Sequence, residues 1–224
     1  MNSSARSAAV GVFDSGVGGV SVLRDMAQRM PRERFLYFGD NVNAPYGTRP
    51  EPEIRDLALA AADFLASRGV KAMVVACNTA TSAAIEVLRA RYDMPVVGME
   101  PALKPAAERT RTRSVGIIAT PATFQGELFS NLVRRYTSDL CVLSQACPGL
   151  VDAVEAGALD TEDTAELLQT YLSPMIEAQV DQLVLGCTHY PFLRPAIEQI
   201  MGPDTCIIDP APSIARQVAL VLKQ

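Results

Sequence analysis

Short apolar runs alternate with longer amphipathic stretches along the whole chain. This alternation is typical of α/β proteins, in which buried parallel strands are joined by helices. The apolar runs predict strands at Ala9–Phe13, Arg34–Phe38, Ala72–Ala76, Val96–Gly98, Ser114–Ile118, Cys141–Leu143, Gln182–Leu185 and Cys206–Ile208. The amphipathic stretches predict helices at Val20–Arg29, Pro52–Ser67, Thr81–Tyr92, Leu103–Arg109, Phe124–Arg135, Gly149–Ala156, Thr161–Ala178, Pro191–Met201 and Ser213–Leu222.

The two halves of the chain share a weak internal repeat. VGVFDSGVGGVSVLRDM has a counterpart in SVGIIATPATFQGELFSNL, and VVACNTATSAAIEVLR has one in LVLGCTHYPFLRPAIEQI. Each member is an apolar strand, a polar turn and a helix, and such turns lie where parallel α/β sheets bind ligands. We expect two pseudo-symmetric Rossmann-like half-domains with mainly parallel sheets and the active-site cleft between them. Their expected bounds are 1–98 plus 207–224 for one and 99–206 for the other.

Composition and charge narrow the functional classes. The chain has 224 residues, 49% of them hydrophobic and 20% charged, and a net charge of −5. This balance is typical of a globular protein, and the acidity without a long basic run argues against nucleic-acid binding. No apolar stretch approaches the roughly 20 residues of a membrane helix, and the N-terminus lacks the pattern of a secretion signal. We therefore expect a cytoplasmic protein.

The reactive side chains restrict the chemistry further. Five cysteines without disulfide or CxxC spacing indicate reduced thiols, and a single histidine excludes a multi-histidine metal site. Lys71, Lys104 and Lys223 do not follow a strand into a polar turn, which disfavours pyridoxal phosphate chemistry. We expect neither a metal nor a cofactor. Three of the thiols are interpreted as small buried hydrophobic side chains: Cys141, Cys147 and Cys206.

The other two thiols, Cys77 and Cys187, follow predicted strands at matching positions of the repeat. A thiolate is polarizable and weakly solvated, which makes it a useful carbon base. The pKa of a free cysteine is about 8.5, and a helix N-terminus lowers it. Because Asn78, Thr79 and Thr188 are natural N-caps, we expect each thiol at a helix N-terminus, where free N–H groups bind the carboxylates of a substrate.

Four motifs occur in order along the chain: DSGVGG at 14–19, the GD-to-PYG segment at 39–47, ACNTAT at 76–81 and GCTHYP at 186–191. Together they resemble the glutamate racemase family. The resemblance runs from about Val10 to Leu222 and includes GMEPA at 98–102, IIATPAT at 117–123 and the CP-to-VEAG segment at 147–157. The segment NVNAPYG departs from it, because the family usually has an arginine a few residues before PYG.

The resemblance implies cofactor-independent racemisation of L-glutamate to D-glutamate for peptidoglycan synthesis, by a homodimer without membrane or nucleic-acid partners. It implies that Cys77 and Cys187 are the two proton donor/acceptors, with Asp14 supporting the first and His189 with Glu155 supporting the second. The implied substrate contacts are Asp14, Ser15, Tyr46, Gly47, Asn78, Thr79, Thr120, Thr123, Thr188 and His189. The side-chain chemistry of two of these residues suits the implied roles. Asp14 can bind an ammonium group, and His189 is close enough in sequence to polarise the thiol of Cys187.

Three alternatives stay open. Gly16, Gly18 and Gly19 follow a strand and Asp40 ends the next, as in dinucleotide-binding proteins, but Ser21 stands where the third small residue belongs. That interpretation also leaves the two cysteine turns unexplained. The second alternative is an aspartate or other amino-acid racemase of the same family. The third is a regulatory member with weak turnover, since some members of the family are reported to inhibit DNA gyrase.

Overall fold

The computed structural model describes residues 8–137 and 139–223, which form two compact units. Unit 1 comprises residues up to Met99 together with the segment from Ala211 onward, and unit 2 comprises Glu100–Pro210. The second boundary differs from the expected residue 207, because β8 (Cys206–Ile208) pairs with β7 (Gln182–Leu185) and keeps the chain in unit 2. No helix among the described residues is long and apolar enough to cross a membrane.

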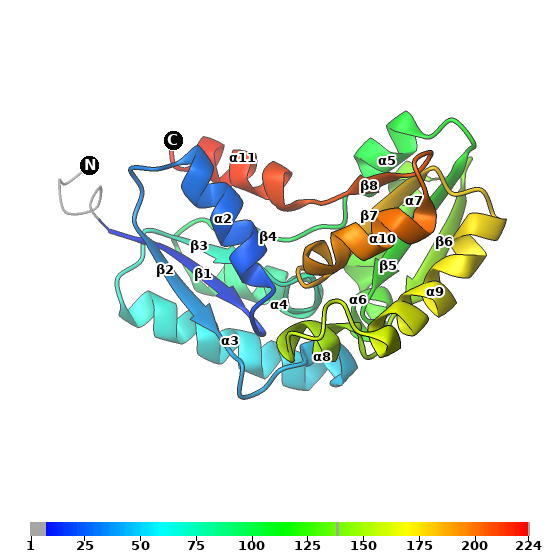
Figure 1. The fold of residues 1–224 in the computed structure, drawn as a ribbon. Helices are drawn as coiled ribbons and strands as arrows, with labels where there is room; N and C mark the ends of the chain where they lie inside the picture. Colours follow the sequence, from blue (N-terminus) through cyan, green and yellow to red (C-terminus); the bar gives the residue numbers. More distant parts are fainter. Residues whose placement is uncertain (1–7, 138, 224) are drawn as a thin grey trace. The chain divides into compact units, whose positions relative to one another are not determined.

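Unit 1 is a parallel four-stranded sheet of order β2-β1-β3-β4 (Figure 1). Its strands are β1 (Val10–Asp14), β2 (Phe35–Gly39), β3 (Ala72–Val75) and β4 (Val96–Gly98). Its helices are α2 (Gly19–Arg29), the 3-10 helix η1 (Tyr46–Thr48), α3 (Glu51–Ser67), α4 (Asn78–Arg91) and α11 (Ala211–Val221). Helices α2 and α11 lie side by side and share one apolar core with β1 and β3.

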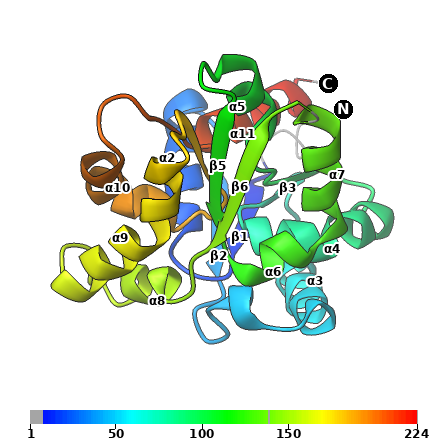
Figure 2. The same ribbon diagram turned by 90° about the vertical axis from the view of Figure 1, so that its right-hand side faces the viewer.

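Unit 2 repeats this topology with the order β6-β5-β7-β8, all parallel. Strands β5 (Ser114–Ala119) and β6 (Cys141–Ala146) join the two already named. The helices are α5 (Leu103–Arg109), α6 (Pro121–Gln125), α7 (Glu127–Tyr136), α8 (Leu150–Glu155), α9 (Glu162–Glu177), the 3-10 helix η2 (Tyr190–Leu193) and α10 (Arg194–Met201). Helices cover both faces of this sheet, with α6 and α7 on one side and α9 and α10 on the other (Figure 2).

The cores explain why these runs are strands. In β1, β3, β5 and β7 every residue is buried, as expected for central parallel strands covered on both faces. The edge strand β6 is partly exposed instead, and Cys141 at its start is exposed, as is Cys206 at the start of the edge strand β8. The interpretation of these two thiols as buried side chains was therefore wrong, whereas Cys147 is buried as predicted.

Besides the helix expected at Pro191–Met201, which begins with the 3-10 helix η2, two helix predictions need correction. The helix expected at Phe124–Arg135 is two helices, because Gly126 is extended, with ψ of 144°, and ends α6 before α7 begins. Helix α4 begins at Asn78 rather than at Thr81. The second difference changes the environment of a candidate catalytic thiol.

A buried carboxylate fixes the turn that leads into β5. Asp181 is 4% exposed, and it accepts hydrogen bonds from the Thr110 hydroxyl and the Arg111 backbone N–H, each at 2.6 Å. Burial by itself raises the pKa of Asp181, but these hydrogen bonds, with that from the Thr112 N–H, hold it below its ordinary value of 3.8. The ionised carboxylate therefore stabilises the folded state.

Candidate active site

Each central strand pair ends in a polar turn that carries one of the candidate thiols. In unit 1 the ladder continues one residue beyond β3, where Ala76 N donates to Phe13 O, and Cys77 is next. In unit 2 Gly186 N donates to Ile118 O at the same 2.8 Å, and Cys187 is next. The internal repeat is thus structural, and the two cysteines occupy equivalent positions at the carboxyl ends of the sheets.

Cys77 is itself the N-cap of α4. Its Sγ accepts a hydrogen bond from the Ala80 backbone N–H at 3.4 Å, and its side chain is 4% exposed. The predicted caps, Asn78 and Thr79, are the first two residues of the helix instead. A sulfur atom at the positive end of a 14-residue helix is in a field that favours the thiolate.

The turn after β1 lies next to this thiol because β1 and β3 are neighbours. Asp14 is fully buried, and its Oδ2 accepts hydrogen bonds from Gly16 N at 3.2 Å and Gly19 N at 2.9 Å. The Oγ of Ser15 lies 3.8 Å from the Sγ of Cys77. This contact with the thiol was not expected from the sequence, which assigned Ser15 to substrate binding.

Asn78 follows Cys77 and is 3% exposed. Neither its Oδ1 nor its Nδ2 has a hydrogen-bond partner among the described residues. A buried carboxamide without partners costs free energy, and such a group is commonly completed by a ligand. This is the arrangement expected of a side chain that binds a substrate.

Tyr46 is buried in the same unit and is anchored by an aspartate. Its hydroxyl donates to Asp40 Oδ2 at 2.6 Å, and Asn43 Nδ2 donates to both oxygens of that carboxylate at 3.0 Å. Burial first, and then the hydrogen bond to Asp40, raise the pKa of Tyr46 well above its ordinary value. Tyr46 is therefore a neutral hydrogen-bonding group, and Gly47 is buried beside it.

In unit 2 the thiol of Cys187 is paired with an imidazole. The Sγ lies 3.8 Å from His189 Nδ1, and His189 Nε2 lies 2.6 Å from Glu155 Oε1 at the end of α8. The side chain of His189 is 2% exposed and that of Glu155 is 19% exposed. When the imidazole is neutral, a proton on Nε2 donates to the carboxylate and leaves Nδ1 to accept a proton from the thiol.

The expected helix N-terminus at Cys187 is not formed. The next element is the 3-10 helix η2, and α10 begins only at Arg194. Pro191 and Pro195 have no N–H groups for an α-helical ladder here, and Tyr190 N and Phe192 N make the shorter i−3 bonds. Thr188 is thus a buried turn residue and not a cap. At Cys187 the structure records the His189 imidazole in place of a helix N-terminus.

The remaining predicted site residues of unit 2 follow β5. Thr120 is the N-cap of α6 and accepts from Thr123 N at 3.4 Å, and the two hydroxyls lie 2.9 Å apart. Both threonines are buried. Because β5 and β7 pair, this turn is the structural equivalent of the Asp14 turn of unit 1.

Sequence reasoning missed two groups near the thiols: the Ala80 N–H at Cys77 and the Tyr190 ring near Cys187. Tyr190 is fully buried, and its hydroxyl donates to Cys147 O at 3.4 Å. Burial, and then the neighbouring Cys187 and Cys147, raise the pKa of Tyr190 well above its ordinary value. Among the described residues no group of three or more His, Cys, Asp or Glu side chains is arranged to hold a metal ion.

Known proteins match both the sequence and the fold. A glutamate racemase of Roseiflexus sp. (strain RS-1) is 48% identical over 216 residues, which cover 96% of this chain and 79% of that protein. The structure of Escherichia coli glutamate racemase in complex with L-glutamate and the activator UDP-MurNAc-ala is 32% identical, with a TM-score of 0.89, covering 97% of this chain and 83% of that one. Glutamate racemase from Francisella tularensis in complex with D-glutamate gives 30% identity and a TM-score of 0.85, covering 97% and 82%.

A family model agrees with these relatives. The model described as Asp/Glu/Hydantoin racemase matches residues 10–218, which is nearly all of the structure described above. The two pseudo-symmetric α/β units and the cysteine motifs both lie within the match. The chain belongs to the Asp/Glu/Hydantoin racemase family.

Proposed function

We propose that this chain interconverts L-glutamate and D-glutamate without a cofactor, using Cys77 and Cys187 as the two bases. The observation that carries the proposal is the equivalence of the two thiols, each buried at the carboxyl end of a parallel sheet and each next to a group that influences its proton. The glutamate racemases among the relatives support the choice of substrate. The resemblance assigns the D enantiomer to Cys77 and the L enantiomer to Cys187.

The reaction requires one proton to leave and another to return. For L-glutamate, the Cys187 thiolate takes the α-proton and the pair of electrons from the C–H bond stays on the substrate as a carbanion. The Cys77 thiol then gives its proton to the other face of the α-carbon, so that the two sulfur atoms exchange protonation states. The reverse reaction follows the same steps backwards, and both thiols must therefore be stable with and without a proton.

Different groups meet this requirement in the two units. At Cys77 the Ala80 N–H and the N-terminus of α4 favour the thiolate. At Cys187 the His189 imidazole accepts the thiol proton on Nδ1, and the Glu155 carboxylate stabilises the imidazolium that results. We assign Asp14 to the support of Cys77 and to the substrate ammonium group, and its hydrogen bonds with Gly16 N and Gly19 N also fix the turn after β1.

We assign the remaining polar residues to substrate binding. The unpartnered carboxamide of Asn78 is the best supported of them, since a carboxylate oxygen and a donor of the substrate complete its hydrogen bonds. Small buried hydroxyls and backbone groups in the same turns hold the two carboxylates: Ser15, Tyr46, Gly47, Thr79, Thr120, Thr123, Thr188 and His189. In this proposal an acidic protein binds the two carboxylates of the substrate through neutral donors.

The same proposal places the protein in the cytoplasm, as a homodimer that supplies D-glutamate for peptidoglycan. The exposed free thiols of Cys141 and Cys206 suit a reducing compartment. Sedimentation of the purified chain tests the dimer directly.

Incubation of the purified chain with L-glutamate in deuterated water tests the activity. We expect loss of optical rotation together with one deuterium at the α-carbon of the D-glutamate formed, without any added cofactor. Unchanged optical rotation after prolonged incubation, with the protein folded, contradicts the proposal.

A further inference from the structure

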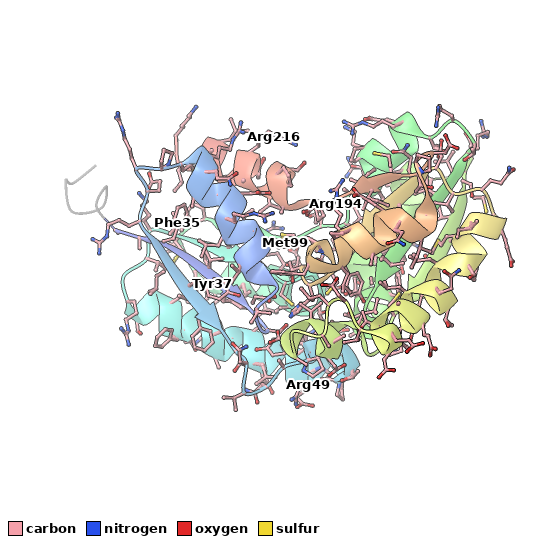
Figure 3. The ribbon with its side chains drawn as sticks, viewed as in Figure 1. Phe35, Tyr37, Arg49, Met99, Arg194 and Arg216 are labelled. Atoms are coloured by element: carbon pink, nitrogen blue, oxygen red, sulfur yellow. The ribbon has the colours of Figure 1, made fainter. Side chains whose placement is uncertain are left out.

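The hydroxyl of Tyr37, labelled in Figure 3, reaches from β2 to the turn after β1. Its Oη donates a hydrogen bond of 2.6 Å to the carbonyl oxygen of Gly16. The register of the sheet makes this contact possible, because Val12 pairs with Tyr37 and the turn begins just beyond Asp14. The bond therefore joins an edge strand to the residue after Ser15.

The turn that Tyr37 contacts is held tightly on other sides as well. The Gly16 N–H donates to Asp14 Oδ2, so both ends of this residue are fixed. A Cβ on Gly19 would lie 2.6 Å from Asp14 Cβ, and one on Gly39 would lie 2.9 Å from Gly16 O. Side chains at these positions would displace the turn, so the turn is closely packed against its neighbours.

Ser15 lies in this turn and contacts the thiol of Cys77. It is 5% exposed, Cys77 is 4% exposed, and their Oγ and Sγ atoms are 3.8 Å apart. A hydroxyl both donates and accepts, so Ser15 can accept the S–H of the thiol and can donate to the thiolate. Small movements of the turn would change this contact, since a hydrogen bond weakens steeply with distance and angle.

We propose that Tyr37 is a positioning residue for Cys77, which acts by holding the Gly16 carbonyl so that the Ser15 hydroxyl stays within reach of the thiol. The inference rests on the proposed role of Cys77 as a base. Tyr37 does not touch the substrate in this scheme. Its effect passes through Ser15 and is confined to the half-reaction that Cys77 begins.

The first test follows the ionisation of Cys77 without requiring turnover. The alkylation rate of Cys77 by iodoacetamide is measured against pH by mass spectrometry of its peptide, and Cys187 in the same sample is the internal control. In Ser15→Ala the profile of Cys77 should move up by about one pH unit, because a hydrogen bond to a charged group is lost. Tyr37→Phe should move it in the same direction by a smaller amount, and Cys187 should not respond in either variant.

A matched control is Tyr92→Phe. Tyr92 lies in unit 1, and its hydroxyl donates a short hydrogen bond to Asp63 on the exposed surface. In Tyr92→Phe the pH profile of Cys77 alkylation should coincide with that of the wild type. If Tyr37→Phe also coincides with the wild type while Ser15→Ala shifts, Tyr37 has no positioning role; if neither shifts, Ser15 does not support the thiol.

A double-variant cycle separates positioning from general loosening of unit 1. If Tyr37 acts through Ser15, Tyr37→Phe should have no further effect in the Ser15→Ala background, and additive shifts would overturn the inference. Thermal unfolding of each variant shows that the fold is intact. Failure of the wild type to racemise glutamate would defeat the proposed function while leaving these alkylation profiles to be judged on their own.

Discussion

Serine in place of Cys77 replaces the sulfur atom of a helix cap with oxygen. The wild-type Sγ accepts from Ala80 N at 3.4 Å, and serine is among the preferred N-cap residues, so the cap survives the substitution. We expect the free energy of unfolding of Cys77→Ser to lie within about 1 kcal/mol of the wild type. Any large loss of activity is then chemical in origin.

The size of that loss follows from what the sulfur does. A serine hydroxyl is ionised to a negligible extent at neutral pH, so the turn keeps its shape and loses its base. A positioned proton-transfer group contributes about 100- to 10,000-fold to a rate, and we expect net racemisation to fall by that factor in Cys77→Ser. Cys187→Ser should behave alike, because His189 Nδ1 then faces a hydroxyl in place of the thiol at 3.8 Å.

The assay that separates the two bases uses a glutamate analogue with chloride on the β-carbon. Removal of the α-proton expels chloride, so the product reports the first abstraction alone. Cys187→Ser should still release chloride from the D analogue through Cys77, and Cys77→Ser should still release it from the L analogue through Cys187. One variant inactive on both enantiomers, with the other active on both, would instead indicate a single base and would refute the two-base reasoning.

Four further outcomes are expected. Glu155→Gln should slow the chloride release that Cys187 begins by about 10- to 100-fold and should leave the release that Cys77 begins unchanged. Asp152→Asn, on the exposed side of the same helix, should change neither rate. An equal loss of both rates in Glu155→Gln argues against the role assigned to Glu155. The kcat/KM for L-glutamate should exceed that for L-aspartate by about 10- to 200-fold. Similar values for the two substrates would support the alternative that the chain is an aspartate racemase. Activity should survive dialysis against a chelator and should need no pyridoxal phosphate. If dialysis abolishes the activity and zinc or pyridoxal phosphate restores it, the prediction of a cofactor-independent enzyme is contradicted. Asp181→Asn should lower the free energy of unfolding by about 1–3 kcal/mol at pH 7. Because the folded-state pKa of Asp181 is lowered, this difference in unfolding free energy should shrink as the pH falls below 3.8, as measured by denaturant titration.

The central strands β1, β3, β5 and β7 were predictable because each is an apolar run that is followed by turn residues and is buried on both faces. The start of α4 was not, because propensity favours Asn78 and Thr79 as caps, whereas the ladder bond at Ala76 fixes the chain so that Cys77 takes the cap. Similarly, local pattern gave one helix at 124–135, although Gly126 adopts an extended conformation and divides it. These differences arise from tertiary geometry that a local window does not contain.

The chemical groups of the site were recognisable from motifs, but their pairings were not. His189 is two residues from Cys187 and was expected beside it, which the 3.8 Å distance confirms. Ser15 and Cys77 are 62 residues apart and meet only through the pairing of β1 with β3. The contact of Tyr37 with Gly16 similarly depends on the register of β1 and β2. Contacts of this kind require the sheet order, which a sequence pattern does not specify.

The division of the chain into units has a consequence for how the protein is synthesised. Unit 2 is one continuous segment, whereas the core of unit 1 includes Ala211, Ile214, Ala215 and Val218 from α11. The chain emerges from the ribosome N-terminus first, so β1 and α2 emerge early and α11 emerges last. All of unit 2 has emerged before α11 can complete the core of unit 1. The face of unit 1 formed by Val10, Val12 and Met26 thus stays without its cover through most of translation, and chaperone binding to nascent chains should concentrate there.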